Sequence, residues 1–282
     1  MQGKHIAITG PTAGIGRSAA LDFAARGASL TLFCRNPDKG ATLERDIVDA
    51  GGERPRLIAM DMARLDSVRS AAQTLLADDR PLDVLLNNAG VVNTRRRLSA
   101  DGYEETLAVN HFAPSLLTGL LLPALRQAPA ARIVNVSSHA HTFVRDMGFE
   151  DMQAEKGYKT FREYGRSKLA NILFTRSLAQ RLEGQDITVN CLHPGAVATS
   201  LGTNNGVTGK VLTTLLKPFF RSPERGAETS IFLCTSAAVK DVSGAYFVDC
   251  KQKNPRPWGL DDSAAERLWQ YTEECVEFQY PV

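Results

Sequence analysis

A tyrosine and a lysine four residues apart form the strongest chemical pattern in the sequence. Tyr164 and Lys168 stand in the stretch Tyr-Gly-Arg-Ser-Lys, and a helix places residues at this spacing on one face. A free phenol has a pKa near about 10 and is a poor proton donor at neutral pH. Because a cation about 4 Å away stabilises a phenolate by about 4 kcal/mol at an effective dielectric constant of about 20, we expect Lys168 to lower the pKa of Tyr164. The pair predicts a tyrosine that gives or takes a proton near pH 7.

Two nearby patterns could support other chemistry. Tyr158 has Arg162 four residues later, but a guanidinium never loses its charge and suits a different geometry, so we expect this tyrosine to pack in a loop. His139 and His141 lie beside Ser138, as in a serine hydrolase. No glycine-flanked nucleophile elbow surrounds that serine, which weighs against hydrolysis.

A glycine-rich turn follows the first predicted strand. Residues 9–16 read Thr-Gly-Pro-Thr-Ala-Gly-Ile-Gly and run directly into a predicted helix. Such glycines permit a tight turn and let the backbone and the helix N-terminus approach a pyrophosphate. The alternative is a glycine-rich turn without a ligand. The residues that we expect to contact a dinucleotide here are Gly10, Thr12, Gly14, Ile15 and Gly16.

The end of the second predicted strand indicates which dinucleotide fits. A carboxylate there would bind the ribose 2′-hydroxyl of NAD, whereas this chain has Cys34 and Arg35, with Lys39 one helical turn later. A guanidinium binds a phosphate through two parallel hydrogen bonds, so Arg35 favours the 2′-phosphate of NADP. The alternative is a solvated arginine that starts the next helix.

Polar residues also follow the third and fourth predicted strands. Asp61 is placed to accept a hydrogen bond from an adenine amino group, and Asn88, Ala89 and Gly90 end the fourth strand. Ligands of open α/β sheets bind at the carboxyl ends of strands. Each polar residue could instead be a helix cap or an Asx turn.

Short β-branched runs alternate with longer amphipathic segments along the chain, as in βαβ units. We expect strands at 5–9, 29–34, 56–60, 84–87, 132–137, 188–192 and 244–248. Helices are expected at 15–26, 39–50, 65–77, 101–126, 163–182, 223–237 and 262–276. The pattern predicts an α/β fold, a Rossmann-type doubly wound seven-stranded parallel sheet with helices on both faces. We expect residues 1–282 to form a single domain, with a C-terminal extension at 249–282.

Composition excludes several classes of protein. Lys and Arg number 33 against 31 Asp and Glu, so no overall field favours nucleic acid, and we expect the run Arg95–Arg97 to be a solvated face. Five scattered cysteines indicate free thiols in a reducing compartment. The longest apolar run, Leu116–Leu125, is too short to cross a bilayer, and no leader precedes the first strand. We therefore expect a soluble cytoplasmic protein.

Six motifs in one order resemble the short-chain dehydrogenase/reductase family across nearly the whole chain. They are the glycine turn, Asn87–Gly90, Asn110, Ser137-Ser138, Tyr164 with Lys168, and His193-Pro194-Gly195. Three further features resemble its retinol dehydrogenase-like branch: His139–His141, Ser167–Asn171 and Gly244–Cys250. That branch acts on lipophilic aldehydes, ketones and steroids. This sequence lacks the N-terminal membrane segment of animal retinol dehydrogenases, which weighs against a retinoid as the physiological substrate.

The resemblance implies a role for each matching residue. Tyr164 would protonate the substrate oxygen, and Lys168 would lower the pKa of that tyrosine and hold the nicotinamide ribose. Ser138, the second serine of its pair, would donate a hydrogen bond to the substrate oxygen. Asn110 would hold a water molecule in a proton relay, the alternative being a structural amide.

The resemblance also implies functions for the segment that follows the sixth predicted strand. Pro194 and Gly195 would shape the backbone around the nicotinamide, and Thr199 would bond its carboxamide. Apolar residues at helical spacing within 199–221 predict a substrate lid, the alternative being a core helix. Lysines on its polar side suggest a weak peripheral membrane contact through 206–221.

These observations predict an NADP(H)-dependent oxidoreductase that acts on CH–OH groups. It would transfer a hydride between nicotinamide and a carbonyl or alcohol of a lipophilic small molecule, retinoid-like or steroid-like, without a metal or nucleic acid. One alternative is an NAD-linked steroid or alcohol dehydrogenase. A second is a non-catalytic dinucleotide-sensing regulator, against which the complete set of Ser138, Tyr164 and Lys168 argues. The family resemblance allows a homo-oligomer paired through helices 101–126 and 163–182.

Overall fold

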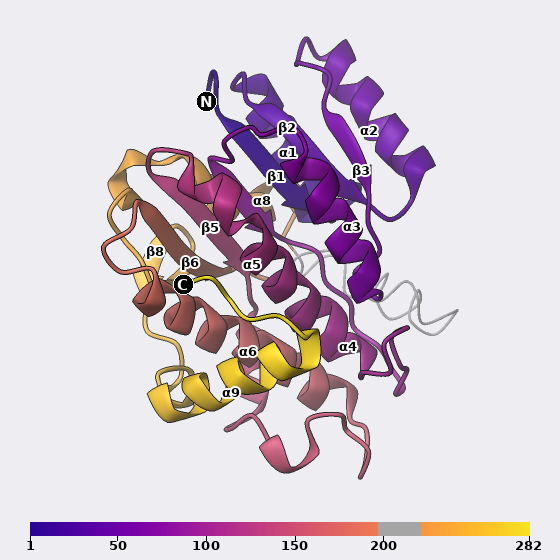
Figure 1. The fold of residues 1–282 in the computed structure, drawn as a ribbon, viewed down its shortest axis with the longest axis vertical. Coiled ribbons are helices and arrows are strands. Elements are labelled where there is room, and N and C mark those ends of the chain that lie inside the picture. The colour runs from indigo at the N-terminus through magenta and orange to yellow at the C-terminus, as the bar shows by residue number, and fades with distance from the viewer. Residues whose placement is uncertain (197–220) are drawn as a thin grey trace.

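Residues 1–196 and 221–282, which the computed structural model describes, build one sheet between two layers of helices (Figure 1). The strand order is β3-β2-β1-β4-β5-β6-β7-β8, and the order reverses between β1 and β4. The strands are β1 (His5–Thr9), β2 (Ser29–Cys34), β3 (Arg56–Ala59), β4 (Val84–Asn87), β5 (Ala131–Val136), β6 (Ile187–His193), β7 (Tyr246–Val248) and β8 (Lys251–Lys253). The first seven run parallel, which confirms the expected doubly wound sheet.

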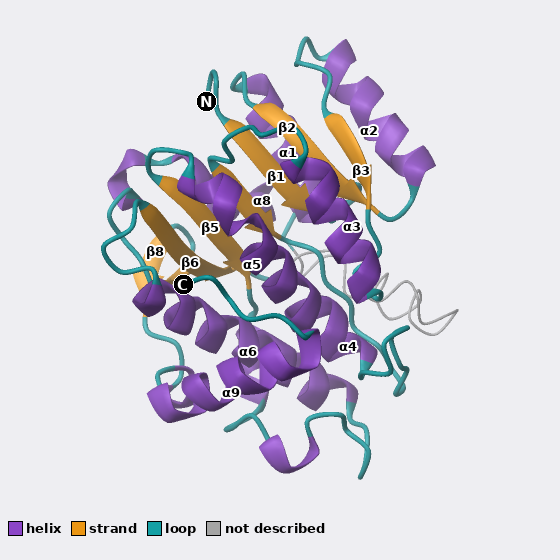
Figure 2. Cartoon of the chain, viewed as in Figure 1, coloured by secondary structure: helices purple, strands orange, loops and turns teal. Residues whose placement is uncertain are grey.

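Helices lie on both faces of this sheet (Figure 2). They are α1 (Gly14–Ala25), α2 (Pro37–Asp49), α3 (Leu65–Leu76), α4 (Glu105–Leu107), α5 (Ala113–Arg126), α6 (Thr160–Arg181), α8 (Pro223–Thr235) and α9 (Asp262–Val276). Side chains of β1 alternate between the two layers, as the pleat requires. Ile6 and Ile8 pack with α1 and α8, whereas Ala7 packs in the core that includes α3, α5 and α6.

The helix expected at 101–126 begins later and is interrupted. Its regular part starts at Glu105, because the carboxylate of Glu104 accepts hydrogen bonds from the backbone N–H groups of Thr106 and Leu107, both at 2.8 Å. The segment Ala108–Phe112 then forms a π-helical turn, labelled η1, before α5 begins. Such turns often occur at functional sites, and nothing in the residue types predicts one here.

The expectation of seven strands was one strand short. The last strand that we expected ends at residue 248, but β8 follows it and pairs antiparallel with β7 through a two-residue turn. Asp249 and Cys250 form this turn in the left-handed region, with φ of 51° and 57°. The sequence lacks the Asn-Gly or Asp-Gly signal of such hairpins, which is why the strand was not predicted. The exposed lysines of β8 protect the edge of the sheet from further pairing.

The C-terminal helix α9 lies against α6 (Figure 1). Trp269 of α9 stacks on Phe174 of α6 with ring centroids 5.7 Å apart. The chain then passes over α5, where a Cβ atom added to Gly119 would lie 2.5 Å from Phe278 and 2.8 Å from Tyr280. The chain itself therefore covers part of the face that α5 and α6 would offer to a second copy.

One described helical segment, Glu105–Arg126, is long and apolar enough to cross a membrane by composition alone. Its mean hydropathy is 1.3, but 89% of its apolar window is buried inside the protein. The segment packs as a core helix between the sheet and α9. All five cysteines are free thiols, as expected.

His111, at the centre of this packing, predicts a specific sensitivity to acid. Its ring is fully buried, Nε2 bonds to Thr272 Oγ1 at 2.8 Å, and burial lowers its pKa to about 3. The unfolded chain binds a proton near pH 6.5, so this contribution to stability is complete above pH 6.5 and is lost as the pH falls toward 3. Its loss at pH 5 is on the order of 2 kcal/mol.

Urea unfolding at pH 7.5 and pH 5 of the wild type and of His111→Gln measures this contribution. The variant is expected to lose less stability on acidification than the wild type. His139→Gln, which changes an exposed ring, serves as the control and should retain the full loss. Equal acid sensitivity in all three proteins would contradict the assignment.

Candidate functional site

A cavity of about 340 Å³ opens at the carboxyl ends of the parallel strands. It lies where the strand order reverses, which is where ligands of open α/β sheets bind. Its lining includes Gly10, Thr12, Gly14, Ile15, Arg35, Asp61, Asn88, Ala89, Gly90, Ser138, Tyr164, Lys168, Pro194 and Gly195, all expected site residues. Gly16 and Asn110 lie outside the lining. Thr199, segment 206–221 apart from Arg221, and nearly all of the expected lid lie outside the described residues.

The glycine turn leaves a helix N-terminus open toward the cavity. Gly10 and Gly14 adopt left-handed φ values of 63° and 53°. A Cβ atom on Gly16 would lie 2.3 Å from the carbonyl oxygen of Gly10, so Gly16 allows close packing rather than lining the cavity. Ala13, the N-cap of α1, provides no side-chain cap, and the first turn of α1 carries no acid. The N–H groups of this turn, which have no side-chain cap in the part of the chain that the structure describes, suit a phosphate.

Asn88 fixes this turn to the end of β4. Its Nδ2 donates to the carbonyl oxygens of Thr9, at 2.9 Å, and of Gly10, at 3.1 Å. In return, Thr9 Oγ1 accepts from the backbone N–H groups of Asn88 and Ala89, at 3.0 and 2.9 Å. These reciprocal bonds close the floor of the cavity.

The end of β2 supplies two exposed cations. Arg35 and Lys39 both line the cavity, and neither forms a salt bridge within the described residues. Asn36 Oδ1 accepts from the backbone N–H of Lys39 at 2.9 Å and so caps α2. Across the cavity, Asp61 Oδ1 accepts from the backbone N–H of Ala63 at 3.0 Å. Asp61 therefore forms an Asx turn, the alternative considered from sequence, while still lining the cavity.

The two serines after β5 have different surroundings. Ser137 is buried and donates its hydroxyl proton to the carbonyl oxygen of Lys168 at 2.7 Å. Ser138 is partly exposed, accepts from the backbone N–H of Ala140 at 3.1 Å, and lies close enough to Tyr164 to lower the pKa of its phenol. The structure thus brings Ser138, rather than Ser137, to the tyrosine.

The expectation that the pKa of Tyr164 lies below its ordinary value was wrong in direction. Burial raises the pKa of Tyr164, and the hydrogen bond with Ser138 opposes this increase only in part. Lys168 Nζ lies 5.7 Å from the centre of the tyrosine ring and donates to the carbonyl oxygen of Val136 at 2.9 Å. Burial also lowers the pKa of Lys168 to about 8, because it disfavours the charged form of the amine. Desolvation, rather than attraction between the two charges, therefore sets the direction of the pKa shift of each residue in this pair.

Asn110 lies on η1 behind the cavity. Its Nδ2 donates to the carbonyl oxygen of Val91 at 3.0 Å and to Ser167 Oγ at 2.9 Å, while its Oδ1 accepts from the N–H of Val91 at 2.7 Å. A Cβ atom on Gly90 would lie 3.2 Å from Asn110 Oδ1 and 3.4 Å from Lys168 Nζ. The amide therefore ties η1 to the loop after β4 and to α6, immediately beside the lysine.

The histidines near Ser138 do not form a hydrolase arrangement. His141 Nδ1 bonds to the backbone carbonyl oxygen of Ser138 at 2.7 Å, not to its hydroxyl. His193 was not predicted as a site residue. Its Nδ1 accepts from the N–H groups of His139, at 3.0 Å, and Gly195, at 3.3 Å, and burial lowers its pKa to about 4. The signal in the sequence that could have identified His193 is its position immediately before Pro194.

Other outcomes concern loops and apolar lining. Tyr158 donates to the carbonyl oxygen of Asn93 at 3.0 Å, so it packs in a loop as expected. Arg96 donates to the carbonyl oxygen of Gln153 at 2.9 Å and is only partly exposed. Sequence reasoning missed the apolar lining residues Ala13, Phe33, Met60, Met62, Val91, Val109 and Val136. Several of them directly flank residues that were predicted.

Comparisons with known proteins agree with this geometry. The family model of the short chain dehydrogenases matches residues 4–208. Retinol dehydrogenase 14 of Mus musculus is 41% identical over 290 residues, which cover 98% of this chain and 86% of that protein. A solved structure of an uncharacterized protein from Mycobacterium paratuberculosis has a TM-score of 0.80 and 26% identity, covering 100% of this chain and 96% of its own.

A second solved structure holds a dinucleotide. It is described as an NAD(P)-dependent gluconate 5-dehydrogenase from Beutenbergia cavernae with bound NADP at low occupancy. It is 27% identical to this chain, with a TM-score of 0.69, and the match covers 88% of this chain and 96% of that one.

The different surroundings of the two serines predict different consequences of their removal. Ser138→Ala is expected to lower turnover by about 10²-fold, the usual scale for a lost hydrogen bond to a reacting oxygen. Ser137→Ala should keep turnover near wild type and lower the free energy of unfolding by about 1 kcal/mol, because it removes one buried hydrogen bond. Steady-state kinetics and urea unfolding of both variants measure these effects. A loss of turnover in Ser137→Ala alone would reverse the assignment.

Proposed function

The chain belongs to the short-chain dehydrogenase/reductase family, on its retinol dehydrogenase-like branch, and we propose that it is an NADP(H)-dependent oxidoreductase of lipophilic carbonyls and alcohols. The observation that carries the proposal is that Ser138, Tyr164 and Lys168 line the same cavity as the glycine turn. A regulator that only binds a dinucleotide would have no use for two converging hydroxyl groups beside a buried lysine.

The two hydroxyl groups can bind and protonate a substrate oxygen. Ser138 holds the oxygen by a hydrogen bond, and Tyr164, which its raised pKa keeps protonated at neutral pH, donates the proton when a carbonyl is reduced. Ser138 also stabilises the phenolate that remains. Lys168, whose pKa is about 8, retains a positive charge at neutral pH and favours the same phenolate. In the oxidative direction, Tyr164 takes the hydroxyl proton back.

The residues around the cavity suit a nicotinamide dinucleotide. The open N-terminus of α1 and the glycine turn would hold its pyrophosphate, Asp61 would face the adenine, and Pro194 and Gly195 would lie beside the nicotinamide. The bound nicotinamide supplies or accepts the hydride.

Two features support NADP over NAD. Arg35 and Lys39 line the cavity at the end of β2, and the residue that would bear the carboxylate for NAD is Cys34. The Beutenbergia cavernae structure with bound NADP has the same fold.

A lipophilic substrate is supported by the relatives and by two exposed rings. Phe143 closes the short helix η2 (His139–Phe143) that follows Ser138, and Phe161 lies one helical turn before Tyr164. Their side chains are 56% and 66% exposed and meet edge to face at 6.0 Å. Exposed aromatic residues that lie within a few positions of Ser138 and Tyr164 in the chain suit an apolar substrate. The retinol dehydrogenase among the relatives is named for a lipophilic alcohol.

We also propose a cytoplasmic location. Five free thiols, four of them buried, suit a reducing compartment. The distribution of the protein between the soluble and membrane fractions of lysed cells tests this proposal.

Replacement of the tyrosine tests the proposed chemistry. Tyr164→Phe is expected to bind NADPH within a few-fold of wild type and to lower turnover by about 10²-fold or more, the usual scale for a lost general acid. Turnover is followed by the absorbance of NADPH with a panel of aldehydes, quinones and steroidal ketones, and binding by its fluorescence. Near-wild-type turnover would end the assignment of Tyr164. Phe161→Tyr adds a hydroxyl one turn away and serves as a control for changes in ring chemistry.

Replacement of the arginine tests cofactor choice. Arg35→Ala should weaken NADPH binding by about 1.5 to 3 kcal/mol, the range for hydrogen bonds to charged groups, and leave NADH binding nearly unchanged. The Arg35→Ala/Lys39→Ala double variant shows whether Lys39 compensates. Equal losses for both cofactors would exclude the 2′-phosphate role, and faster turnover by the wild type with NADH would favour the NAD-linked alternative.

A further inference from the structure

Ser138 and Tyr164 lie at the two ends of one connection. The chain leaves β5, passes Ser138, crosses residues 139–159 and enters α6, where Tyr164 lies in the second turn. The relative position of the two hydroxyl groups therefore depends on how this connection is held. An enzyme loses on the order of 10²-fold in rate when a reacting group is misplaced by about 1 Å.

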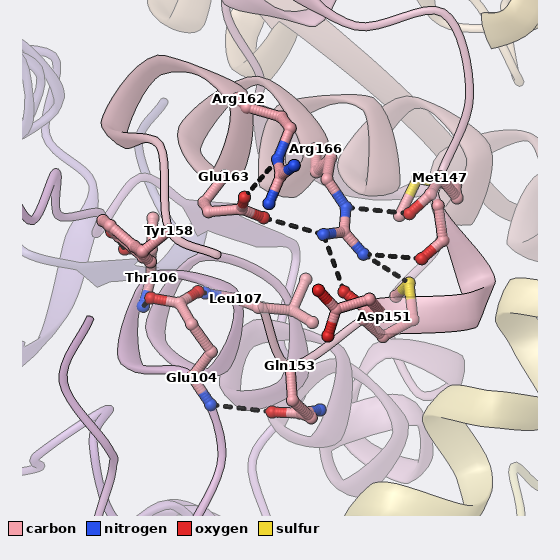
Figure 3. A network of polar contacts seen from close by, with 12 residues as sticks. Glu104, Thr106, Leu107, Met147, Asp151, Gln153, Tyr158, Arg162, Glu163 and Arg166 are labelled. Atoms are coloured by element: carbon pink, nitrogen blue, oxygen red, sulfur yellow. Dashed lines mark hydrogen bonds and ion pairs between the residues drawn. The ribbon is translucent and has the colours of Figure 1, made fainter. Parts of the chain in front are cut away.

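One buried arginine binds the middle of this connection. Arg166 Nε donates to the carbonyl oxygen of Met147 at 2.8 Å. Nη1 donates to the carbonyl oxygen of Asp151 and Nη2 to that of Gly148, both at 2.9 Å. Figure 3 shows the guanidinium facing these groups from the side of α6. We call this set of contacts, together with the ion pair described next, the Arg166 clamp.

The remaining N–H groups of the guanidinium are also used. Nη1 donates to Glu163 Oε2 at 2.8 Å and Nη2 to Met152 Sδ at 3.3 Å (Figure 3). Arg166 and Glu163 are only 5% and 3% exposed. Glu163 Oε1 accepts from Arg162 Nε at 2.5 Å. All five guanidinium N–H groups thus have partners, and the carboxylate is shared between two arginines.

The same connection also contacts the helix that carries Asn110. Gln153 Oε1 accepts from the backbone N–H of Glu104 at 2.7 Å, immediately before α4 (Figure 3). Tyr158 bonds to Thr106 Oγ1 at 3.1 Å. Segment 147–158 therefore joins the starts of the two helices behind the cavity.

We propose that Arg166 is a positioning residue, which holds Ser138 and Tyr164 in register by fixing residues 147–151 to the first turns of α6. This proposal rests on the proposed roles of those two residues. A buried ion pair is weak evidence for stability alone, because apolar replacements of similar volume are often as stable. A planar guanidinium with five directed N–H groups can instead fix the directions of three carbonyl groups, which neither an apolar side chain nor a lysine can reproduce.

The position of Arg166 within the stretch Tyr164–Lys168 explains how it can have this role. Arg166 is two residues after Tyr164, so it leaves the opposite side of α6. The tyrosine faces the cavity while the arginine faces the connection. Arg166 therefore has no expected contact with the cofactor or the substrate, and its replacement should change the rate of the reaction without changing cofactor binding.

Arg166→Met tests the proposal, with Arg132→Met as a matched control. Arg132 is another largely buried arginine, which donates to the carbonyl oxygens of Leu233 and Ser236 at 2.9 and 2.8 Å, away from the cavity. We expect kcat of Arg166→Met to fall by about 10-fold or more, with the Kd of NADPH within about 2-fold of wild type. Arg132→Met should lose melting temperature but keep kcat within about 2-fold. The carbonyl compound reduced fastest by the wild type is used throughout.

Two further variants separate positioning from folding. Arg166→Lys keeps the charge beside Glu163 but loses the directed bonds, so kcat should still fall by about 5-fold or more. Glu163→Leu/Arg166→Met removes both buried charges, and we expect it to recover melting temperature without recovering kcat. Hydrogen exchange should increase at 147–153 in every Arg166 variant and extend to 138–143.

These measurements distinguish a positioning role of Arg166 from a role in folding alone. Wild-type kcat in Arg166→Lys or in the folded double variant would overturn the proposal, as would equal losses of kcat in Arg166→Met and Arg132→Met at equal losses of melting temperature. Failure of the proposed chemistry is recognised separately, because Tyr164→Phe would then remain active. An inactive Tyr164→Phe with an active Arg166→Lys would leave the chemistry intact and refute only the positioning role.

Discussion

Reciprocal hydrogen bonds between Thr9 and Asn88 hold together the neighbouring strands β1 and β4 at their carboxyl ends. The chain order reverses between these strands, so their connections leave in opposite directions and a crevice opens above them. The glycine turn lies on one side of this crevice and the loop containing Gly90 on the other. The cavity, its phosphate-binding turn and the position of Lys168 all depend on this junction.

Burial of Tyr164 and Lys168 determines how the two side chains of the site hold their protons. A lysine taken out of water favours its neutral form, and a tyrosine favours its phenol, so neither acquires the pKa expected from the attraction between the two charges. The result still suits reduction, because a tyrosine that keeps its proton until a substrate oxygen arrives can donate it. Ser138, which follows a different element, is a small polar group that favours the phenolate by hydrogen bonding.

Much of the fold and of the site could be predicted from local patterns. Strand bounds followed from β-branched runs, and Arg35, Tyr164 and Gly195 lie on the cavity because strand ends and helix faces obey fixed periods. Other features depend on contacts between distant residues and left no local signal. The π-helical turn around Asn110, the hairpin through Asp249, and the pKa of Lys168 belong to this group.

The contact between His111 and Thr272 joins residues 161 positions apart in the chain. Contacts this distant form slowly, since the loop between them must close before the contact can stabilise anything. On the ribosome, residues 105–126 emerge long before α9, so the part of their apolar surface that α9 covers is exposed in the meantime. This interval exposes the nascent chain to aggregation. The core around His111 is therefore completed only after the C-terminal helix has been synthesised.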